Sequence, residues 1–552
     1  MLKGFTPYQK KDAEKYNRLG WWAGLTFGDI LDKAADVYPQ KEALVDARSR
    51  FTYSQLRETV NRLAIGFMDL GIKTTDRVLL QLPNWSEFVS SYFALQKVGA
   101  IPVLLIDRYR QYEINHLLRL TGATAWIVPE RYKKIDYLPI IEDVLRDHRK
   151  GKGKAKQLIL VRGKRYKGYH NLETLIERSE LTKGNLNRLA KRRPDPMQVA
   201  HMGPTGGTTG LPKVTPRTHN DFLCRVEYTA RAWELTSMDS MLICAPVGHD
   251  LSFSIGLCPT LFTFGKMVML DSTQPEDVCL IIQKERISAV AWTPTLASRL
   301  INFEGLGDYD LSSLRKMYCG GGASPSQLVR DVSQRLGCIY VNAYGGTEGM
   351  KIQTRLDDDV ELVCRSVGKP ACPYDSYKIV DTKGKGVPRN TQGELVVKGP
   401  GIFTGYYRVP EENKKAFDKH GFFRTGDLAM MDDGGNITIT GRIREMINRG
   451  GESISAVEVE NLISNHPDVA AVAVIAMPDP VMGERVCAYV QPKGGTEIDF
   501  EKIISFLKSN MASVLQLPER IEFMDFLPLT RANKVDKKVL LEDIQAKISR
   551  SA

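Results

Sequence analysis

The segment from residue 205 to residue 213, Thr-Gly-Gly-Thr-Thr-Gly-Leu-Pro-Lys, has the residue types needed to bind phosphate groups. Adjacent glycines let backbone N–H groups turn inward without obstruction by a Cβ atom, and threonine hydroxyls add further donors. The lysine supplies a positive charge. We therefore predict a loop around the β- and γ-phosphates of a nucleotide, with an unliganded surface loop as the alternative. The predicted phosphate contacts are Thr205, Gly206, Gly207, Thr208, Thr209 and Lys213.

This segment is not a Walker A motif. Pro212 occupies the position before the lysine where Walker A has glycine, and Val214 replaces the Ser or Thr that follows it. The kinase and P-loop ATPase interpretations therefore lose their main support.

Six further motifs follow in order along the chain. Together with the phosphate loop they resemble the signatures of the adenylate-forming superfamily, which includes acyl-CoA synthetases, peptide-synthetase adenylation domains and luciferases. Seven motifs in the same order cover most of the chain, so a chance match is disfavoured. The six are Gly320-Gly-Gly-Ala323, Asn342-Ala-Tyr-Gly-Gly-Thr-Glu348, Gly393-Glu-Leu-Val-Val-Lys-Gly-Pro400, Phe423-Arg-Thr-Gly-Asp427, the segment Gly441–Glu452, and Pro528-Leu-Thr-Arg-Ala-Asn-Lys-Val535.

The resemblance implies a nucleotide site. Tyr344 is expected to stack on adenine, Asp427 to accept both ribose hydroxyls, and Arg442 to contact the ribose. The turn after residue 320 is expected to pack on adenine. The remaining residues implied at this site are Gly321, Gly322, Ala323, Asn342 and Gly345.

Adenylation joins two anions, a carboxylate and a triphosphate, so neutralisation of charge should dominate catalysis. Glu348 is the expected ligand of Mg²⁺, and Thr347 can donate to the α-phosphate. Lys534 resembles the family's mobile catalytic lysine, which contacts the attacking carboxylate and the α-phosphate. Asn533 replaces the glycine that usually precedes this lysine.

The family moves its small C-terminal domain between two poses, because this lysine would hinder entry of the thiol in the second step. Arg444 occupies the expected hinge position. Gly450 and Gly451 would line the thiol channel in the second pose.

Within the superfamily, the chain is most similar to stand-alone aryl-acid–AMP ligases, the branch that activates 2,3-dihydroxybenzoate. His249 resembles the aromatic gate of the acyl pocket. Asp250 replaces an asparagine that reads a ring hydroxyl in this branch, and Lys351 replaces a small apolar residue; the two side chains could pair with each other. A six-membered ring acid, aromatic or alicyclic, is expected. The predicted pocket consists of His249, Asp250, Ser254, Gly320, Gly321, Gly346 and Lys351.

The elements that must position these residues follow an α/β pattern. Between about residues 25 and 300, short β-rich runs such as 77–82 and 100–106 alternate with amphipathic stretches such as 86–98, which predicts layers with mainly parallel sheets. Short strands with Gly and Asp turns between residues 368 and 439 predict a smaller β subdomain. We expect an adenylation core over residues 1–441 and a mobile α/β domain over 442–552, with a helix at 456–464.

Composition is that of a globular protein, with 43% hydrophobic and 26% charged residues. The net charge of +11 favours polyanionic partners such as nucleotides and CoA, although a basic surface without a specific partner is equally compatible. The basic stretch 146–167 is interpreted as a solvated loop, with a phosphate-attracting or docking surface as the alternative. It lacks aromatic residues interleaved for stacking, so we expect no nucleic-acid partner.

Nine scattered cysteines without a Cys-x-x-Cys pair indicate reduced thiols. No apolar run approaches the roughly 18 residues that span a bilayer, and no secretory signal is visible, so a cytoplasmic location without a membrane span is expected.

The favoured function is an AMP-forming acid:CoA ligase that uses ATP, Mg²⁺ and a small carboxylic acid. The first alternative is an aryl-acid–AMP ligase that loads a separate aryl carrier protein. The second alternative is a non-catalytic nucleotide- or acyl-binding protein, which the presence of Lys213, Glu348, Asp427 and Lys534 disfavours.

Overall fold

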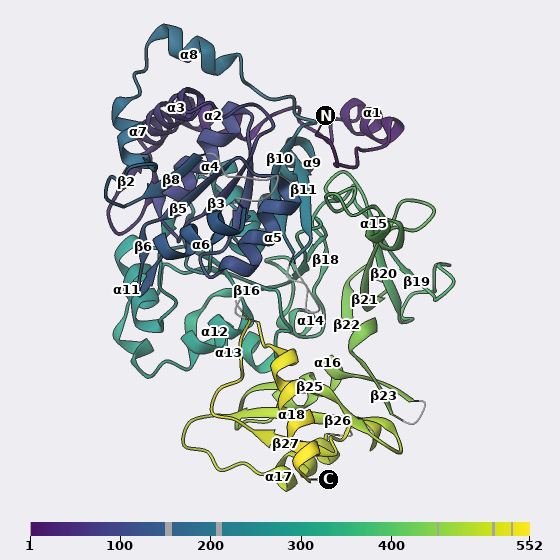
Figure 1. The fold of residues 1–552 in the computed structure, drawn as a ribbon. Helices are drawn as coiled ribbons and strands as arrows, with labels where there is room; N and C mark the ends of the chain where they lie inside the picture. Colours follow the sequence, from purple (N-terminus) through teal and green to yellow (C-terminus); the bar gives the residue numbers. More distant parts are fainter. Residues whose placement is uncertain are drawn as a thin grey trace.

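The first 370 residues of the computed structural model contain two large sheets and the helices that pack on them (Figure 1). The structure describes residues 2–148, 157–205, 212–449, 452–510, 514–530 and 534–551. A nine-stranded sheet has the order β18-β17-β16-β15-β14-β12-β13-β1-β2, and a seven-stranded sheet has the order β11-β10-β4-β3-β5-β8-β9. Their strands are β1 (Glu42–Val45), β2 (Arg50–Thr52), β3 (Arg77–Gln81), β4 (Ile101–Leu105), β5 (Ala125–Pro129), β8 (Gln157–Val161), β9 (His170–Asn171), β10 (Val199–Pro204), β11 (Val214–Thr218), β12 (Ser240–Ile243), β13 (Lys266–Met269), β14 (Ala289–Trp292), β15 (Lys316–Gly320), β16 (Ile339–Gly345), β17 (Lys351–Gln353) and β18 (Lys369–Pro370).

Most neighbouring strands in both sheets are parallel, as the alternating pattern predicts. Strands β4 and β5 are buried along their whole length because helices cover both faces, which is typical of parallel sheets. Helix α4 (Ser86–Val98) has the predicted span. It ends at Gly99, whose φ of +75° is a left-handed conformation that glycine adopts without steric cost. The predicted α/β class is confirmed.

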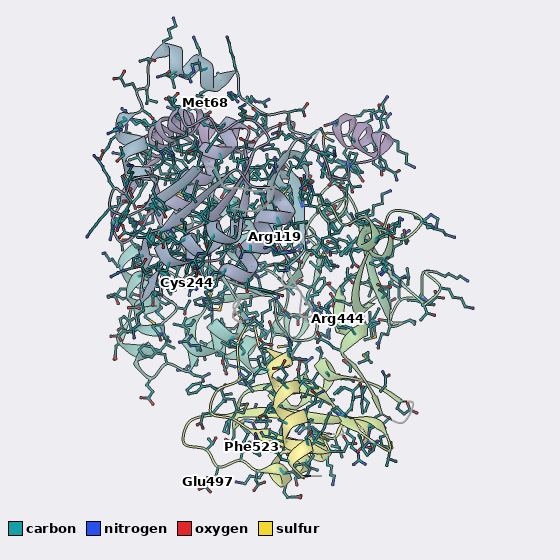
Figure 2. All side chains as sticks on the ribbon, in the orientation of Figure 1. Met68, Arg119, Cys244, Arg444, Glu497 and Phe523 are labelled. Carbon is teal, nitrogen blue, oxygen red and sulfur yellow. The ribbon has the colours of Figure 1, made fainter. Side chains whose placement is uncertain are left out.

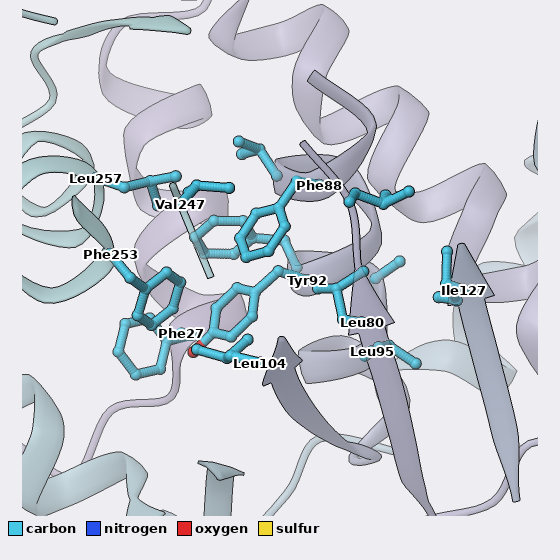
Figure 3. Close-up of a cluster of buried hydrophobic side chains, with 14 of the residues drawn as sticks. Phe27, Leu80, Phe88, Tyr92, Leu95, Leu104, Ile127, Val247, Phe253 and Leu257 are labelled. Atoms are coloured by element: carbon cyan, nitrogen blue, oxygen red, sulfur yellow. The ribbon is translucent and has the colours of Figure 1, made fainter. Parts of the chain in front are cut away.

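A cluster of aromatic rings anchors the segment that begins the acyl pocket. Figure 3 shows Phe27 from α2 (Phe27–Val37), Tyr92 from α4 and Phe253 from the π-helix η1 (Leu251–Leu257) packed together. The rings of Tyr92 and Phe253 have centroids 4.8 Å apart in an edge-to-face arrangement. Because η1 is fixed by this core, the residues just before it are held in place as well.

The predicted β subdomain is a four-stranded antiparallel sheet in the order β19-β20-β21-β22. Its strands are β19 (Ser376–Val380), β20 (Gly393–Lys398), β21 (Phe423–Met431) and β22 (Ile437–Arg442). The last strand leads directly into the C-terminal part of the chain (Figure 1).

The C-terminal part contains a five-stranded sheet formed by β23 (Met446–Arg449), β24 (Glu452–Ser455), β25 (Val469–Asp479), β26 (Gly483–Pro492) and β27 (Arg520–Phe523). Helix α16 (Ala456–Ser464) has the predicted bounds, and α17 (Phe500–Ser509) and α18 (Lys537–Ser551) complete the unit. Separate hydrophobic clusters pack on this sheet, one with α16 and α17 and one with α18. In Figure 1 this unit lies below the two large sheets, and the yellow segment before α18 reaches up to them.

The basic stretch is not a solvated loop throughout. Residues 149–156 lie outside the described residues, but Gln157–Val161 forms strand β8. Arg162 is only 7% exposed and forms ion pairs of 2.6 Å with Asp46 and 2.7 Å with Glu87. At these positions the expectation of a solvated loop is wrong, because buried carboxylates on other elements neutralise the arginine.

All nine cysteines are free, and eight of them are buried. Across the described ranges, no helix combines the length and apolar character required to cross a membrane.

Candidate active site

The base of the predicted phosphate loop is a hairpin between β10 and β11, in which the N–H of Thr205 donates to the carbonyl of Lys213 at 2.8 Å. The predicted contacts Gly206, Gly207, Thr208 and Thr209 lie outside the described residues. Lys213 Nζ lies 3.0 Å from Glu412 Oε2 and 4.7 Å from the ring centre of Tyr406. The lysine is therefore directed to the same region as Tyr406.

Tyr406 links this lysine to the predicted metal ligand. Its hydroxyl donates to Glu348 Oε1 at 2.8 Å. Burial raises the pKa of Glu348, and the hydrogen bond from Tyr406 opposes that rise. Within the described ranges, Glu348 Oε2 accepts no hydrogen bond from another residue, so this oxygen can bind a cation.

Three predicted nucleotide residues meet at the end of the four-stranded sheet. Asp427 on β21 faces Arg442 on β22, and Arg442 Nε lies 2.7 Å from Asp427 Oδ1. The hydroxyl of Tyr344, at the end of β16, donates to Asp427 Oδ2. The Asp427 carboxylate is 4% exposed and is held between an arginine and a tyrosine, an arrangement that fixes its orientation.

Asn342 lies on strand β16, and Thr347 lies in the turn that follows this strand. The contacts of the two residues differ. The side-chain amide of Asn342 donates to the carbonyls of Val363 and Ser366, both at 3.0 Å, so both of its N–H donors hold the protein backbone. Thr347 packs against Gly203 of β10, where a Cβ atom would lie 2.7 Å from its methyl group. Its carbonyl accepts a hydrogen bond of 3.1 Å from Arg217.

The predicted catalytic lysine reaches the large sheets from the far end of the chain. Lys534 Nζ lies 3.6 Å, and its Cε 3.3 Å, from the position that a Cβ atom on Gly321 would occupy. Gly321 directly follows β15 and has a φ of +83°. Although Lys534 keeps an exposed surface, surrounding protein atoms and then Arg442 lower the pKa of its ammonium group. Gly322 and Ala323 continue the same turn.

His249 and Asp250 lie at the start of η1. Burial, followed by the charge of Lys534, lowers the pKa of His249 to about 4, so the imidazole is neutral at physiological pH. Both oxygens of Asp250 accept hydrogen bonds from Arg225, at 3.0 and 2.8 Å. Burial alone would raise the pKa of Asp250, but this bidentate pair lowers it strongly. The ion-pair partner of Asp250 is Arg225 of α9 (His219–Ala232), not the expected Lys351.

Lys351 nevertheless lies close to Asp250 and Arg225. It is 4% exposed, lies opposite Gly345 in the β16–β17 pairing, and its Nζ is 4.4 Å from the ring centre of Tyr318 on β15. Ser254 is fully buried, and its hydroxyl donates to the carbonyl of Asp250 at 2.7 Å. Ser254 therefore fixes the pocket segment from within η1.

The other predicted pocket glycines line the two strand ends. A Cβ atom on Gly320 would lie 3.2 Å from the carbonyl of Ala343, and one on Gly346 would lie 2.8 Å from Glu348 Oε2. A side chain at Gly320 would therefore be tightly packed, and one at Gly346 would displace the side-chain ends of Met350 and Glu348.

Arg444 lies in a short 3₁₀ turn, η3 (Ile443–Glu445), between β22 and β23. Figure 2 shows it where the chain passes from the four-stranded sheet to the C-terminal sheet. Its side chain is exposed and forms no ion pair within the described parts of the chain. The predicted channel glycines, Gly450 and Gly451, lie outside the described residues.

Sequence reasoning missed Tyr406 and Arg225. Arg225 lies on a helix whose first eight residues are all buried, which signals an internal ion pair, but the local sequence does not give its partner, because Asp221, four residues earlier, pairs with Arg217 instead. Tyr406 carries no comparable signal, because its partner Glu348 lies 58 residues away.

The comparisons with known proteins agree with this geometry. The model of the AMP-binding enzyme family matches residues 31–407, and the model of its C-terminal domain matches residues 458–534. The chain is 34% identical over 549 residues to the 2,3-dihydroxybenzoate-AMP ligase of Bacillus subtilis, with 99% of each chain covered. It is 34% identical over 548 residues to a salicylyl-CoA synthase / salicylate adenylyltransferase of a Streptomyces species, covering 99% of this chain and 98% of the relative.

Two further matches also extend over the whole chain. Enterobactin synthase component E of Escherichia coli is 31% identical over 551 residues, with 99% of each chain covered. The apo structure of Mycobacterium smegmatis MbtA is 29% identical, covers 98% of both chains and has a TM-score of 0.72. The chain belongs to the AMP-binding enzyme family and is an ATP-dependent ligase.

Proposed function

We propose that this enzyme activates an aryl acid with ATP and then transfers the aryl group to the thiol of a separate carrier protein. In the first step a carboxylate oxygen attacks the α-phosphorus, the bond to the β-phosphate oxygen breaks, and pyrophosphate leaves. In the second step the thiol sulfur attacks the carbonyl carbon, and AMP leaves. The observation that carries the proposal is the approach of Lys534 to Gly321, beside His249 and Asp250, in a chain similar along its whole length to 2,3-dihydroxybenzoate-AMP ligase.

The carboxylate, the phosphates and the ribose of the substrates each have a side chain of complementary chemistry in the proposed site. Lys534 would contact the attacking carboxylate and the α-phosphate, and Lys213 the β- and γ-phosphates after leaving Glu412. Asp427, fixed by Arg442 and Tyr344, would accept the ribose hydroxyls.

Glu348 would bind Mg²⁺, together with the phosphates. Its free Oε2 and its burial fit one hard oxygen ligand. Within the described ranges, no group of three or more His, Cys, Asp or Glu side chains is arranged to bind a metal, which fits an ion held mainly by the substrate. When bound, Mg²⁺ neutralises the negative charge of the triphosphate.

We further propose that residues 442–552 form a domain that moves about Arg444. In the present pose Lys534 occupies the site, so a thiol would enter only after this domain has turned away. Arg444 is exposed, lies in a single 3₁₀ turn and has no ion-pair partner among the described residues, which supports a hinge there.

A carrier protein is favoured over CoA as the thiol acceptor. This reverses the preference drawn from the sequence. Similarity to enterobactin synthase component E, a protein named as part of a multi-component synthase, supports a protein-bound acceptor. CoA is the second candidate, because another relative, which is 34% identical, is named as a salicylyl-CoA synthase / salicylate adenylyltransferase.

To test this proposal, the carrier protein and CoA are each supplied as the thiol acceptor for the same aryl adenylate. The enzyme is incubated with Mg²⁺, ATP and a panel of aryl acids, with either a phosphopantetheinylated aryl carrier protein or CoA, and products are followed by mass spectrometry. We expect carrier acylation to exceed formation of the CoA thioester at least tenfold in kcat/KM. Equal or faster transfer to CoA would reverse the choice of acceptor.

A further inference from the structure

Among the described residues around Asp250, the buried Lys351 is the cation that lacks an ion-pair partner. Arg225 and Asp250 form a bidentate pair and neutralise each other. Lys351 is 4% exposed and lies within the electrostatic reach of this pair, yet it has no carboxylate partner. Within the described ranges, no side chain or carbonyl accepts a hydrogen bond from Lys351 Nζ.

The ammonium group of Lys351, at the start of β17, lies near the end of β16 and beside β15. Nζ lies 3.7 Å from where a Cβ atom on Gly345 would be, and it lies over the ring of Tyr318. The side of Gly345 and the ring face of Tyr318 that lie against Nζ therefore carry no hydrogen-bond acceptor. Burial, and then the charge of Arg225, lowers the pKa of Lys351 well below its ordinary value, as expected for a cation without a counter-ion.

The reacting carboxylate of the substrate does not supply that counter-ion. In the proposed function this carboxylate lies at the α-phosphate and is matched by Lys534 beside Gly321. Asp250 does not supply it either, because both of its oxygens are occupied by Arg225. A second acidic group on the substrate would complete the charge balance and provide an acceptor at Nζ.

We infer that the substrate is a ring acid with a second carboxylate, and that Lys351 binds this second carboxylate. The inference rests on the proposed function and names its substrate class. Lys351 then acts as the residue that distinguishes substituted acids from plain ring acids.

The test compares matched acids in acid-dependent pyrophosphate–ATP exchange. Benzoate, the hydroxybenzoates and the benzenedicarboxylates are given to the wild-type enzyme, Lys351→Met and Lys351→Arg. Lys369→Met serves as a control, since this lysine is exposed on the neighbouring strand β18. The wild type should prefer at least one benzenedicarboxylate over benzoate by about tenfold to a hundredfold in kcat/KM, the range of a charge-assisted hydrogen bond.

Lys351→Met should lose this preference mainly through a higher KM for the preferred acid. Lys351→Arg should retain part of the preference, and Lys369→Met all of it. Preference for a hydroxybenzoate over every benzenedicarboxylate would contradict a second carboxylate as the partner of Lys351. Equal use of benzoate and every substituted acid by the wild type would overturn the inference.

Thermal unfolding separates recognition from a structural role. Methionine keeps the hydrocarbon part of the side chain over Tyr318, so Lys351→Met should melt at the same temperature as the wild type or higher. The preferred acid should raise the melting temperature of the wild type but not that of Lys351→Met. A variant that melts lower and loses activity equally with all acids would contradict the inference, whereas exchange with none of the acids by the wild type would refute the proposed function itself.

Discussion

At the scale of single residues, the site depends on buried charges whose partners come from other elements. Glu348 shows this most clearly. Burial raises the pKa of its carboxyl group, whereas the hydroxyl of Tyr406 stabilises the ionised form that a cation requires. Tyr406 therefore determines how far the pH can fall before Glu348 is protonated.

Tyr406→Phe tests this dependence. Loss of the hydroxyl should raise the pKa of Glu348 further, because the hydrogen bond that stabilises the ionised carboxylate is removed. Since the ionised carboxylate is the active form, the acid limb of the pH–rate profile for pyrophosphate exchange should move to higher pH. Tyr407→Phe is the matched control, because Tyr407 is buried and donates to the carbonyl of Lys3 instead. An unchanged acid limb in Tyr406→Phe would show that Glu348 does not limit the rate.

At the scale of elements, strand ends and turns bring these residues together. Asp427 meets Arg442 because β21 and β22 are paired in that register, and Lys351 meets Gly345 for the same reason on β16 and β17. The turn after β15 is equally important, because Gly321 leaves the space that Lys534 occupies.

Gly321→Ala should therefore impair adenylation. A Cβ atom would lie 3.3 Å from Lys534 Cε, and the φ of +83° would cost about 1–2 kcal/mol for any other residue. We expect a loss of about tenfold to a hundredfold in kcat for pyrophosphate exchange, because the lysine would be displaced from its position.

Gly322→Ala is the control for this turn, since the nearest atom to its Cβ position is Pro294 Cδ at 3.9 Å and its φ is not in the left-handed region. It should keep activity and melting temperature. Equal kinetic losses in both variants would mean that the turn tolerates no side chain at all, and that contact with Lys534 is not the cause.

Helices and strands could be predicted from the sequence where the local hydrophobic pattern determines them. Apolar runs predict buried parallel strands such as β4, and helical spacing predicts α4 and α16 with their observed bounds. The pairing of Asp250 with Arg225 was not predictable in the same way, because α9 and η1 are brought together by packing and not by any local signal. Arg162 was misinterpreted for the same reason: its carboxylate partners lie on distant segments.

At the scale of the whole molecule, the C-terminal unit completes a site whose other residues lie on the preceding sheets. Lys534 sits beside Gly321, and Lys537 forms ion pairs with Glu460 at 2.7 Å and Glu445 at 3.5 Å. Glu445 belongs to the same turn as Arg444. The segment that carries Lys534, the proposed catalytic lysine, is thus tied to the turn proposed as the hinge.

The most direct test is acid-dependent exchange of labelled pyrophosphate into ATP by the wild type, Lys534→Ala and Lys538→Ala. Lys538 is an exposed lysine near the start of α18 and serves as the control. We predict exchange by the wild type and Lys538→Ala with an aryl acid, and a loss of about a hundredfold or more in Lys534→Ala. Exchange by Lys534→Ala at the wild-type rate, or none by the wild type with any aryl acid, would contradict the account.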